Sequence, residues 1–125
     1  MKKFVRSKIT LAVIQVTIVS DRLGEMNFPV TDHDAAVLAA TIEALNQYCT
    51  LDEGEYSSEA GRLKGLIFGL ETGSHAEGTT GYDMTVSILK RVKAGANLSG
   101  LEVTKVRRVL GLFVLYLKEL RKSLG

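Results

Sequence analysis

Two histidines stand close to acidic residues, and this pattern comes nearest to a metal-binding or catalytic site. His33 lies between two aspartates, and His75 lies between Glu71 and Glu77. Imidazole and carboxylate groups can bind Zn²⁺, but a closed zinc site needs four well-placed ligands. The sequence has no HExxH motif and no cysteine pair to complete one. We therefore expect no metal site.

No other motif predicts catalysis. The segment from Glu71 to Gly81 is rich in Gly, Ser and Thr and precedes a predicted helix, as phosphate-binding loops do. It contains neither GxxxxGK nor GxGxxG, and its acidic residues would repel an anion. GxSxG is also absent, and Asp52, Glu53 and Glu55 lie in a polar loop that would not separate the pKa values of paired carboxylates. The sequence predicts a non-enzymatic protein without a cofactor.

The cysteine content and the N-terminal segment predict a cytoplasmic protein. Cys49 is the single cysteine, so the chain forms no internal disulfide, and its apolar helical context predicts a buried side chain. Lys2 to Lys8 followed by the apolar run Ile9 to Val19 resembles a signal peptide. The run includes polar residues, lacks a small-x-small cleavage site and is too short to span a bilayer.

Charge is sorted into blocks along the chain, and this predicts the partner. Residues 1–23 hold five basic residues and one acid, residues 24–85 hold eleven acids and two bases, and residues 86–125 hold nine bases and two acids. The net charge of +2 hides this segregation. If folding brings the two ends together, they form a positive face suited to nucleic-acid phosphates. The residues expected to bind nucleic acid are Lys90, Arg91, Lys93, Lys105, Arg107, Arg108, Lys118, Arg121 and Lys122.

The same blocks allow other interpretations. Acidic and basic segments could complement each other between copies in a homo-oligomer, or neutralise each other within one subunit. The acidic stretch from Asp52 to Glu59 could instead bind a protein partner, as an adaptor, inhibitor or immunity protein would. The apolar residues expected at an interface are Leu112, Leu115, Ile14 and Val16. The sequence thus predicts a self-associating accessory subunit of a larger assembly that contacts nucleic-acid phosphates, with the protein-binding adaptor or inhibitor as the alternative. No membrane partner is expected.

The N-terminal segment is predicted to be a β-ribbon. Ile9 to Val19 is dense in β-branched residues, which suit a strand. Met26, Phe28 and Val30 alternate as a second strand, with Pro29 at its edge. We therefore expect an α+β, predominantly helical single domain over residues 1–125, with a ribbon in residues 1–30 packed on a helical body in residues 31–125. The alternative is an all-α bundle with an N-terminal helix.

Four helices are expected in the helical body. Thr31 and Asp34 form a capping pattern, followed by apolar residues at helical spacing up to Cys49. Further helices are predicted from Ser57 or Ser58 to about Leu70, over 82–93 and over 101–122. The last has the broadest apolar face and is therefore expected to be central. The residues of that face are Val106, Val109, Leu110, Phe113, Leu117 and Leu120.

Three glycines recur on one face of the second of these helices. Gly61, Gly65 and Gly69 are spaced by four residues, and each costs about 1 kcal/mol relative to alanine inside a helix. Close approach of a neighbouring element would offset that cost, so we expect this face to pack in the core.

Overall fold

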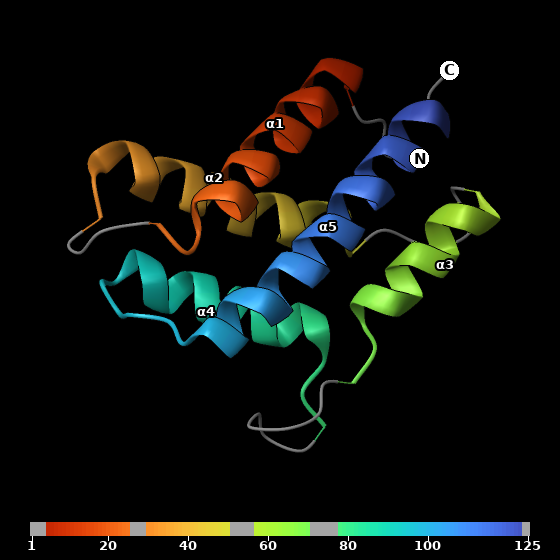
Figure 1. The fold of residues 1–125 in the computed structure, drawn as a ribbon. Coiled ribbons are helices and arrows are strands. Elements are labelled where there is room, and N and C mark those ends of the chain that lie inside the picture. Colours follow the sequence, from red (N-terminus) through yellow and green to blue (C-terminus); the bar gives the residue numbers. More distant parts are fainter. Residues whose placement is uncertain (1–4, 26–29, 51–56, 71–77, 124–125) are drawn as a thin grey trace.

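The computed structural model of the chain describes residues 5–25, 30–50, 57–70 and 78–123. Within these ranges 79% of the residues are helical, and the remaining secondary structure is an isolated bridge between Leu70 and Thr80. The helices are α1 (Arg6–Arg22), α2 (Asp32–Tyr48), α3 (Ser58–Ile67), α4 (Gly81–Lys93) and α5 (Gly100–Ser123) (Figure 1).

The predicted N-terminal ribbon is wrong, because Ile9 to Val19 lies within α1. The buried side chains of α1 recur every three or four residues, as on one face of a helix. β-Branched residues disfavour a helix by only a few tenths of a kcal/mol each, and burying this face outweighs that cost. Met26 and Phe28, in the second predicted strand, lie outside the described residues. The fold is therefore an all-α bundle and not an α+β domain. The buried residues of α1 are Ile9, Ala12, Val16 and Val19.

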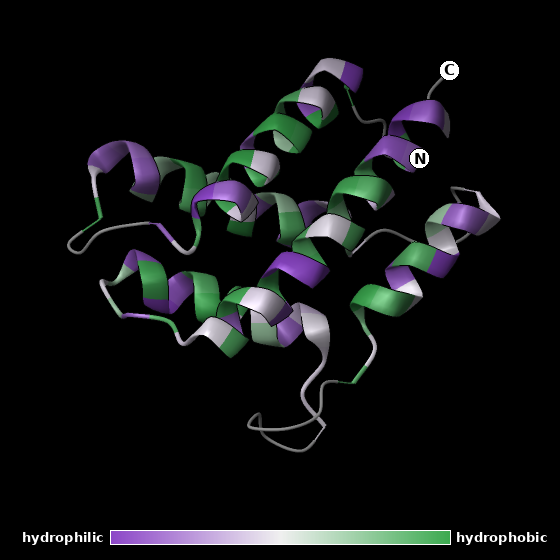
Figure 2. Ribbon diagram, in the orientation of Figure 1, coloured by the Kyte–Doolittle hydropathy of each residue, from purple (hydrophilic) through white to green (hydrophobic). Residues whose placement is uncertain are grey.

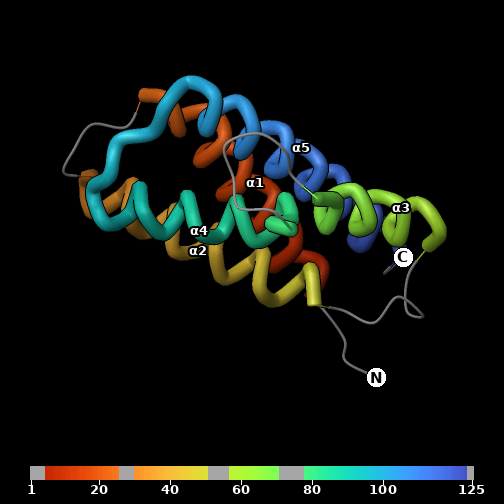
Figure 3. The backbone as a smooth tube through the Cα atoms, turned by 90° about the horizontal axis from the view of Figure 1, so that it is seen from below, coloured from red at the N-terminus to blue at the C-terminus, as the bar shows by residue number. Residues whose placement is uncertain are grey.

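The helices form two layers with α5 at the centre of the front one. In Figure 1, α1 and α3 lie on either side of α5, and Figure 3 shows α2 and α4 behind this layer. Hydrogen bonds show that α1 and α5 are antiparallel. Arg107, near the start of α5, donates to the carbonyl of Ser20, and Arg121, near its end, donates to Thr10. The N-terminal and C-terminal helices are thus neighbours.

The predicted helix starts and the apolar face of α5 are confirmed. The hydroxyls of Thr31 and Ser57 accept hydrogen bonds from the backbone N–H groups of Asp34 and Ala60, at 3.1 and 3.2 Å. All six predicted apolar residues of α5 are buried, and Tyr116 joins them, donating its hydroxyl to the carbonyl of Tyr48 at 2.8 Å. The bundle therefore shares a core to which every helix contributes.

A bidentate ion pair closes the corner between α1 and α2. Nε and one terminal nitrogen of Arg22 donate to the two carboxylate oxygens of Asp34, both at 2.9 Å. The Asp34 side chain is 2% exposed, whereas that of Arg22 is 43% exposed. The Arg22 hydrogen bonds outweigh the effect of burial and lower the pKa of Asp34 below its ordinary value of 3.8. Arg22 is thus a structural cation.

Candidate nucleic-acid interface

The solvent-facing side of α5 carries a stripe of basic residues. Helical spacing places them opposite the buried face, and Gly111 and Leu115 lie among them. In Figure 2, α5 has hydrophilic stretches toward both ends and a more hydrophobic middle. Arg108 and Lys118 are separated by about 15 Å along the helix axis, at about 1.5 Å per residue. We define the outer stripe as the exposed residues Arg107, Arg108, Gly111, Leu115, Lys118 and Lys122.

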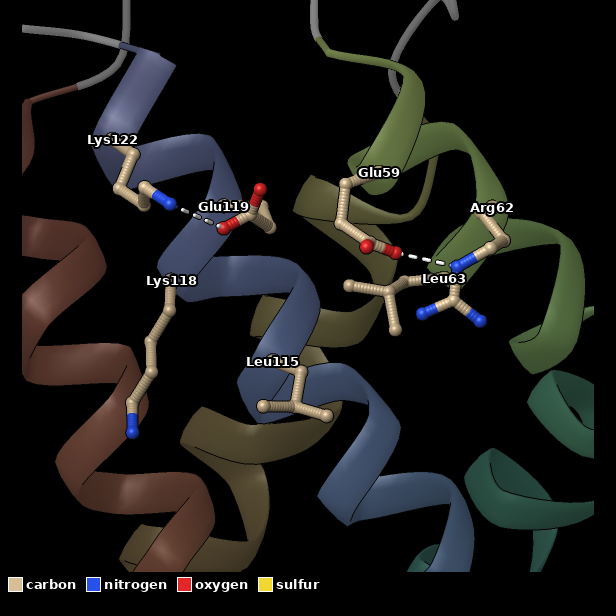
Figure 4. Close-up of a pocket in the computed structure, with 7 residues that line it drawn as sticks. All are labelled: Glu59, Arg62, Leu63, Leu115, Lys118, Glu119 and Lys122. Carbon is tan, nitrogen blue, oxygen red and sulfur yellow. Dashed lines mark hydrogen bonds and ion pairs between the residues drawn. The ribbon is translucent and has the colours of Figure 1, made fainter.

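A shallow groove of about 370 Å³ runs beside the stripe, between α3 and α5 (Figure 4). Leu63 and Leu115 form its apolar part, and both acids that line it are held by ion pairs. Glu119 pairs with Lys122 at 3.3 Å within α5, and the second pair lies within α3. Lys118 extends away from these acids, toward α1. The residues that line the groove are Glu59, Arg62, Leu63, Leu115, Lys118, Glu119 and Lys122.

Two of the predicted cations join α5 to α1. Arg107 donates from Nε to the carbonyl of Ser20 at 2.8 Å and from a terminal nitrogen to the carbonyl of Asp21 at 3.2 Å. These carbonyls belong to the last turn of α1, where the carbonyl oxygens have no N–H partner within the helix. Arg121 donates to Oγ1 of Thr10 at 3.1 Å. Both arginines bond neutral groups, so their positive charges are not cancelled by these contacts.

The other predicted cations do not belong to the outer stripe. Arg91 forms an ion pair with Glu102, which joins the end of α4 to the start of α5. Lys105 is half-buried, and Lys90 and Lys93 are exposed on α4, in the back layer. The structure therefore brings together four of the nine predicted residues on one face and distributes the other five elsewhere.

A capping box that sequence analysis missed supports the Arg91 contact. The Ser99 hydroxyl accepts from the Glu102 N–H at 3.2 Å, and the Glu102 carboxylate accepts from the Ser99 N–H at 3.1 Å. The Ser-x-x-Glu pattern was the signal that could have revealed it. The Ser99 backbone and Arg91 lower the pKa of Glu102 below its ordinary value of 4.5. Glu102 thus neutralises one predicted nucleic-acid ligand.

The start of α1 adds positive charge beside the end of α5. Arg6 and Lys8 are exposed, and the antiparallel packing places them at the same end of the layer as Lys118 and Lys122. Lys2, at the start of the basic N-terminal segment, lies outside the described residues. The structure therefore gathers part of the positive charge from both terminal segments.

The four predicted interface residues occupy different environments. Leu115 and Ile14 are 51% and 52% exposed, whereas Leu112 is half-buried against the core. Val16 is fully buried, so its side chain contributes to the core. The exposed pair lies on different helices, Leu115 on α5 and Ile14 on α1.

The predicted packing role of the glycine face of α3 is wrong. A Cβ atom added at Gly61 or Gly65 would meet no atom within 4 Å. At Gly69 the nearest atom is the carbonyl oxygen of Leu66, three residues earlier in the same segment. No neighbouring element approaches Gly61 or Gly65, so their conformational cost is not offset within the described chain.

The candidate catalytic residues form no site among the residues that the structure describes. His33 is exposed in the first turn of α2, and these ranges contain no cluster of three His, Cys, Asp or Glu side chains that could hold a metal ion. Cys49 is 1% exposed, and burial raises the pKa of its thiol to about 12. A neutral, buried thiol is a poor nucleophile. His75 and the rest of 71–77, and residues 51–56 of the acidic stretch, lie outside the described residues.

Comparisons with known proteins give no relative for this chain. No protein-family model matches it, and no curated protein or solved structure matches it. In the described part of the chain, no helix combines the length and apolar character needed to cross a bilayer. The surface of the bundle is therefore the basis for a functional proposal.

Proposed function

We propose that this protein binds nucleic acid through the outer stripe of α5. The observation that supports this most is the presence of four exposed cations on one face of the central helix of the front layer. Lysine and arginine side chains neutralise phosphates and release bound counterions, which drives sequence-independent binding. The contacts that we propose are made by Arg107, Arg108, Lys118 and Lys122, and Arg6 extends the positive surface.

The side chains of the stripe favour contacts to the nucleic-acid backbone over recognition of bases. Base stacking requires exposed aromatic rings, and the aromatic residues of α5, Phe113 and Tyr116, are fully buried. Phosphate contacts position a protein without reading the sequence. We therefore expect similar affinity for nucleic acids of different sequence, in a non-enzymatic, accessory role.

Charge reversal with a matched control tests the proposal. The test variant is Lys118→Glu with Lys122→Glu, and the control is Lys90→Glu with Lys93→Glu. Both pairs are exposed lysines near a helix C-terminus, and both variants change the net charge equally. Binding to fluorescent double-stranded DNA and single-stranded RNA is measured by anisotropy. Losing two phosphate contacts predicts an affinity roughly 50-fold lower at about 0.1 M salt for the test variant.

The control variant is expected to retain affinity within about threefold, because its cations lie in the back layer and lose only long-range attraction. Equal losses in the two variants would show that net charge, not the outer stripe, governs binding. Absence of binding to either nucleic acid at low salt would overturn the proposal.

A second candidate function, protein binding, is favoured by the groove between α3 and α5. Its apolar part includes Leu115, which is 51% exposed, and its two acids are already paired. Such a surface could accept an acidic partner with one apolar anchor. Leu115→Ser discriminates between the two functions, because it leaves every cation of the stripe in place. Nucleic-acid affinity is expected to stay unchanged, whereas affinity for a protein partner would fall.

A further inference from the structure

α1 has an apolar outward face that the proposed phosphate contacts do not use. Leu11 and Ile14 are 53% and 52% exposed, and Ile18 is half-buried on the same face. The alternating spacing of three and four residues is that of the seam between two packed helices. Thr17, which flanks the seam, donates its hydroxyl to the carbonyl of Val13 at 2.7 Å. Burying Thr17 in an interface would therefore leave no hydroxyl without a hydrogen bond. The face is built to pack against another helix.

Opposite charges lie at the two ends of α1, where Asp21 continues the spacing of the apolar face and Lys8 flanks it. Lys8 is exposed near the start of α1, and Asp21 is exposed near its end. Neither side chain has an ion-pair partner among the described residues. When two copies of such a helix lie antiparallel, the lysine end of each meets the aspartate end of the other. The face is therefore complementary to itself in charge as well as in polarity.

We propose that α1 is a homodimer interface in which the α1 helix of a second copy packs antiparallel to it. The contact is two-fold symmetric, so Lys8 of each copy pairs with Asp21 of the other, and Leu11, Ile14 and Ile18 form the centre. A parallel arrangement would place like charges together at both ends. The helix spans 17 residues, about 25 Å, which limits the contact to less than about 1,200 Å² and predicts a weak dimer.

The dimer goes beyond the proposed function and does not depend on it. Ser20, whose carbonyl bonds Arg107 of α5, lies on the opposite side of α1 from Leu11 and Ile18. Thr10, which bonds Arg121, lies beside Ile14 at the edge of the apolar face. The outer stripe therefore stays available in the dimer, and each dimer would present two stripes to nucleic acid.

Analytical ultracentrifugation in the absence of nucleic acid tests the dimer. Between about 10 µM and about 500 µM, the average mass is expected to rise from 13.6 kDa toward twice that value. The variants Lys8→Glu and Asp21→Lys should each associate at least tenfold more weakly, because each places like charges together. Mixed in equal amounts, they should associate as the wild type does, because the mixed dimer keeps one native Lys8–Asp21 pair and restores the other pair with exchanged signs. Both substitutions suit the helix dipole, so folding is retained.

Two further variants distinguish a specific interface on α1 from nonspecific hydrophobic association. Ile14→Glu should leave a monomer at every concentration, whereas Leu66→Glu, at a 46% exposed leucine of α3, should leave the dimer unchanged. A mass that stays at 13.6 kDa throughout would overturn the proposal, as would a mixture of the two charge variants that associates no better than each alone. Equal effects of the two glutamate variants would also overturn it. Because nucleic acid is absent, none of these results bears on the outer stripe.

Discussion

The corner between α1 and α2 and the outer stripe of α5 use basic side chains in opposite ways. At the corner, Arg22 makes a bidentate ion pair with Asp34, whose side chain is 2% exposed. On the stripe, Lys118 and Lys122 are exposed, and Lys122 pairs with Glu119, one turn earlier in the same helix. A cation paired with a buried acid supports the fold, whereas an exposed cation is available to a ligand.

The comparison teaches that a cation whose acid is almost fully buried, as Asp34 is, belongs to the fold. An ion pair within one helix that has an exposed cation contributes only about 0.5 kcal/mol, so a phosphate can easily replace the carboxylate as the partner of that cation. A buried pair cannot be exchanged, because the abandoned charge would remain without solvation. Arg91 is structural for a different reason, because its partner Glu102 also caps α5 and the pair joins α4 to α5.

Removing Arg22 is the change expected to have the largest effect on stability. Arg22→Met would leave the Asp34 carboxylate, which is 2% exposed, without its cation, and should lower the free energy of unfolding more than the loss of any surface ion pair. The matched control is Arg62→Met, which removes an ion pair whose side chains are 61% and 48% exposed. The control should change the free energy by less than about 0.5 kcal/mol. Urea denaturation measures both, and equal losses would remove the distinction between the two kinds of cation.

The same pair predicts loss of stability in acid. Because the folded protein holds the pKa of Asp34 below 3.8, ionised Asp34 stabilises the fold above that pH. The contribution is lost as the pH falls from about 4 through the lowered pKa of the folded state, and Glu102 acts in the same direction. Thermal unfolding between about pH 2 and pH 6 should show this loss. Arg22→Met should reduce the pH-dependent part, and an unchanged pH profile in that variant would contradict the assignment.

A smaller effect is expected at the start of α5. Ser99→Ala removes the hydroxyl that accepts the Glu102 N–H and so should lower the free energy of unfolding by about 1 kcal/mol. Ser123→Ala is the control, because that hydroxyl donates to a carbonyl at the opposite, exposed end of the same helix. Thermal denaturation measures both variants. A loss at Ser123 as large as that at Ser99 would contradict a structural role for the capping box.

The exposed glycine face of α3 predicts a gain in stability when a side chain is added to it. Gly65→Ala is expected to raise the free energy of unfolding by about 0.5 to 1 kcal/mol, because the added methyl group meets open space and the helix gains propensity. Gly78→Ala is the control, since its φ of +84° is strained for any residue with a Cβ, and it should lower stability. Denaturant midpoints give both values. Destabilisation by Gly65→Ala would show that an element packs closely on this face after all.

The sequence predicted the helices with local signals and failed where a local signal was misleading. Thr31 and Ser57 predict helix starts because a hydroxyl side chain can accept a hydrogen bond from the N–H three residues later. The structure has both of these caps. The β-branched run from Ile9 to Val19 indicated a strand because propensity is a local quantity. Its helical conformation depends on packing against α2 and against α5, and α5 lies at the other end of the described chain.

The candidate site was predicted in part. Charge blocks identified the cations of α5 correctly as a group on a shared helix, because helical spacing follows from sequence. They did not reveal that Arg91 pairs with Glu102, or that Arg107 and Arg121 hold α1, since each of those contacts joins two helices. Of the apolar seam of α1, sequence analysis predicted Ile14 and missed Leu11, because these two residues share a face only in a helical conformation.

The salt dependence of DNA binding tests the central claim most directly. Four phosphate contacts by the outer stripe predict that the logarithm of the association constant falls with the logarithm of salt concentration with a slope of about −3.6. Replacing Lys118 and Lys122 by alanine should reduce the slope to about −1.8 while leaving the free energy of unfolding within about 0.5 kcal/mol of the wild-type value. A slope that is the same in the variant and the wild type, or binding that does not respond to salt, would contradict the assignment of the outer stripe to nucleic acid.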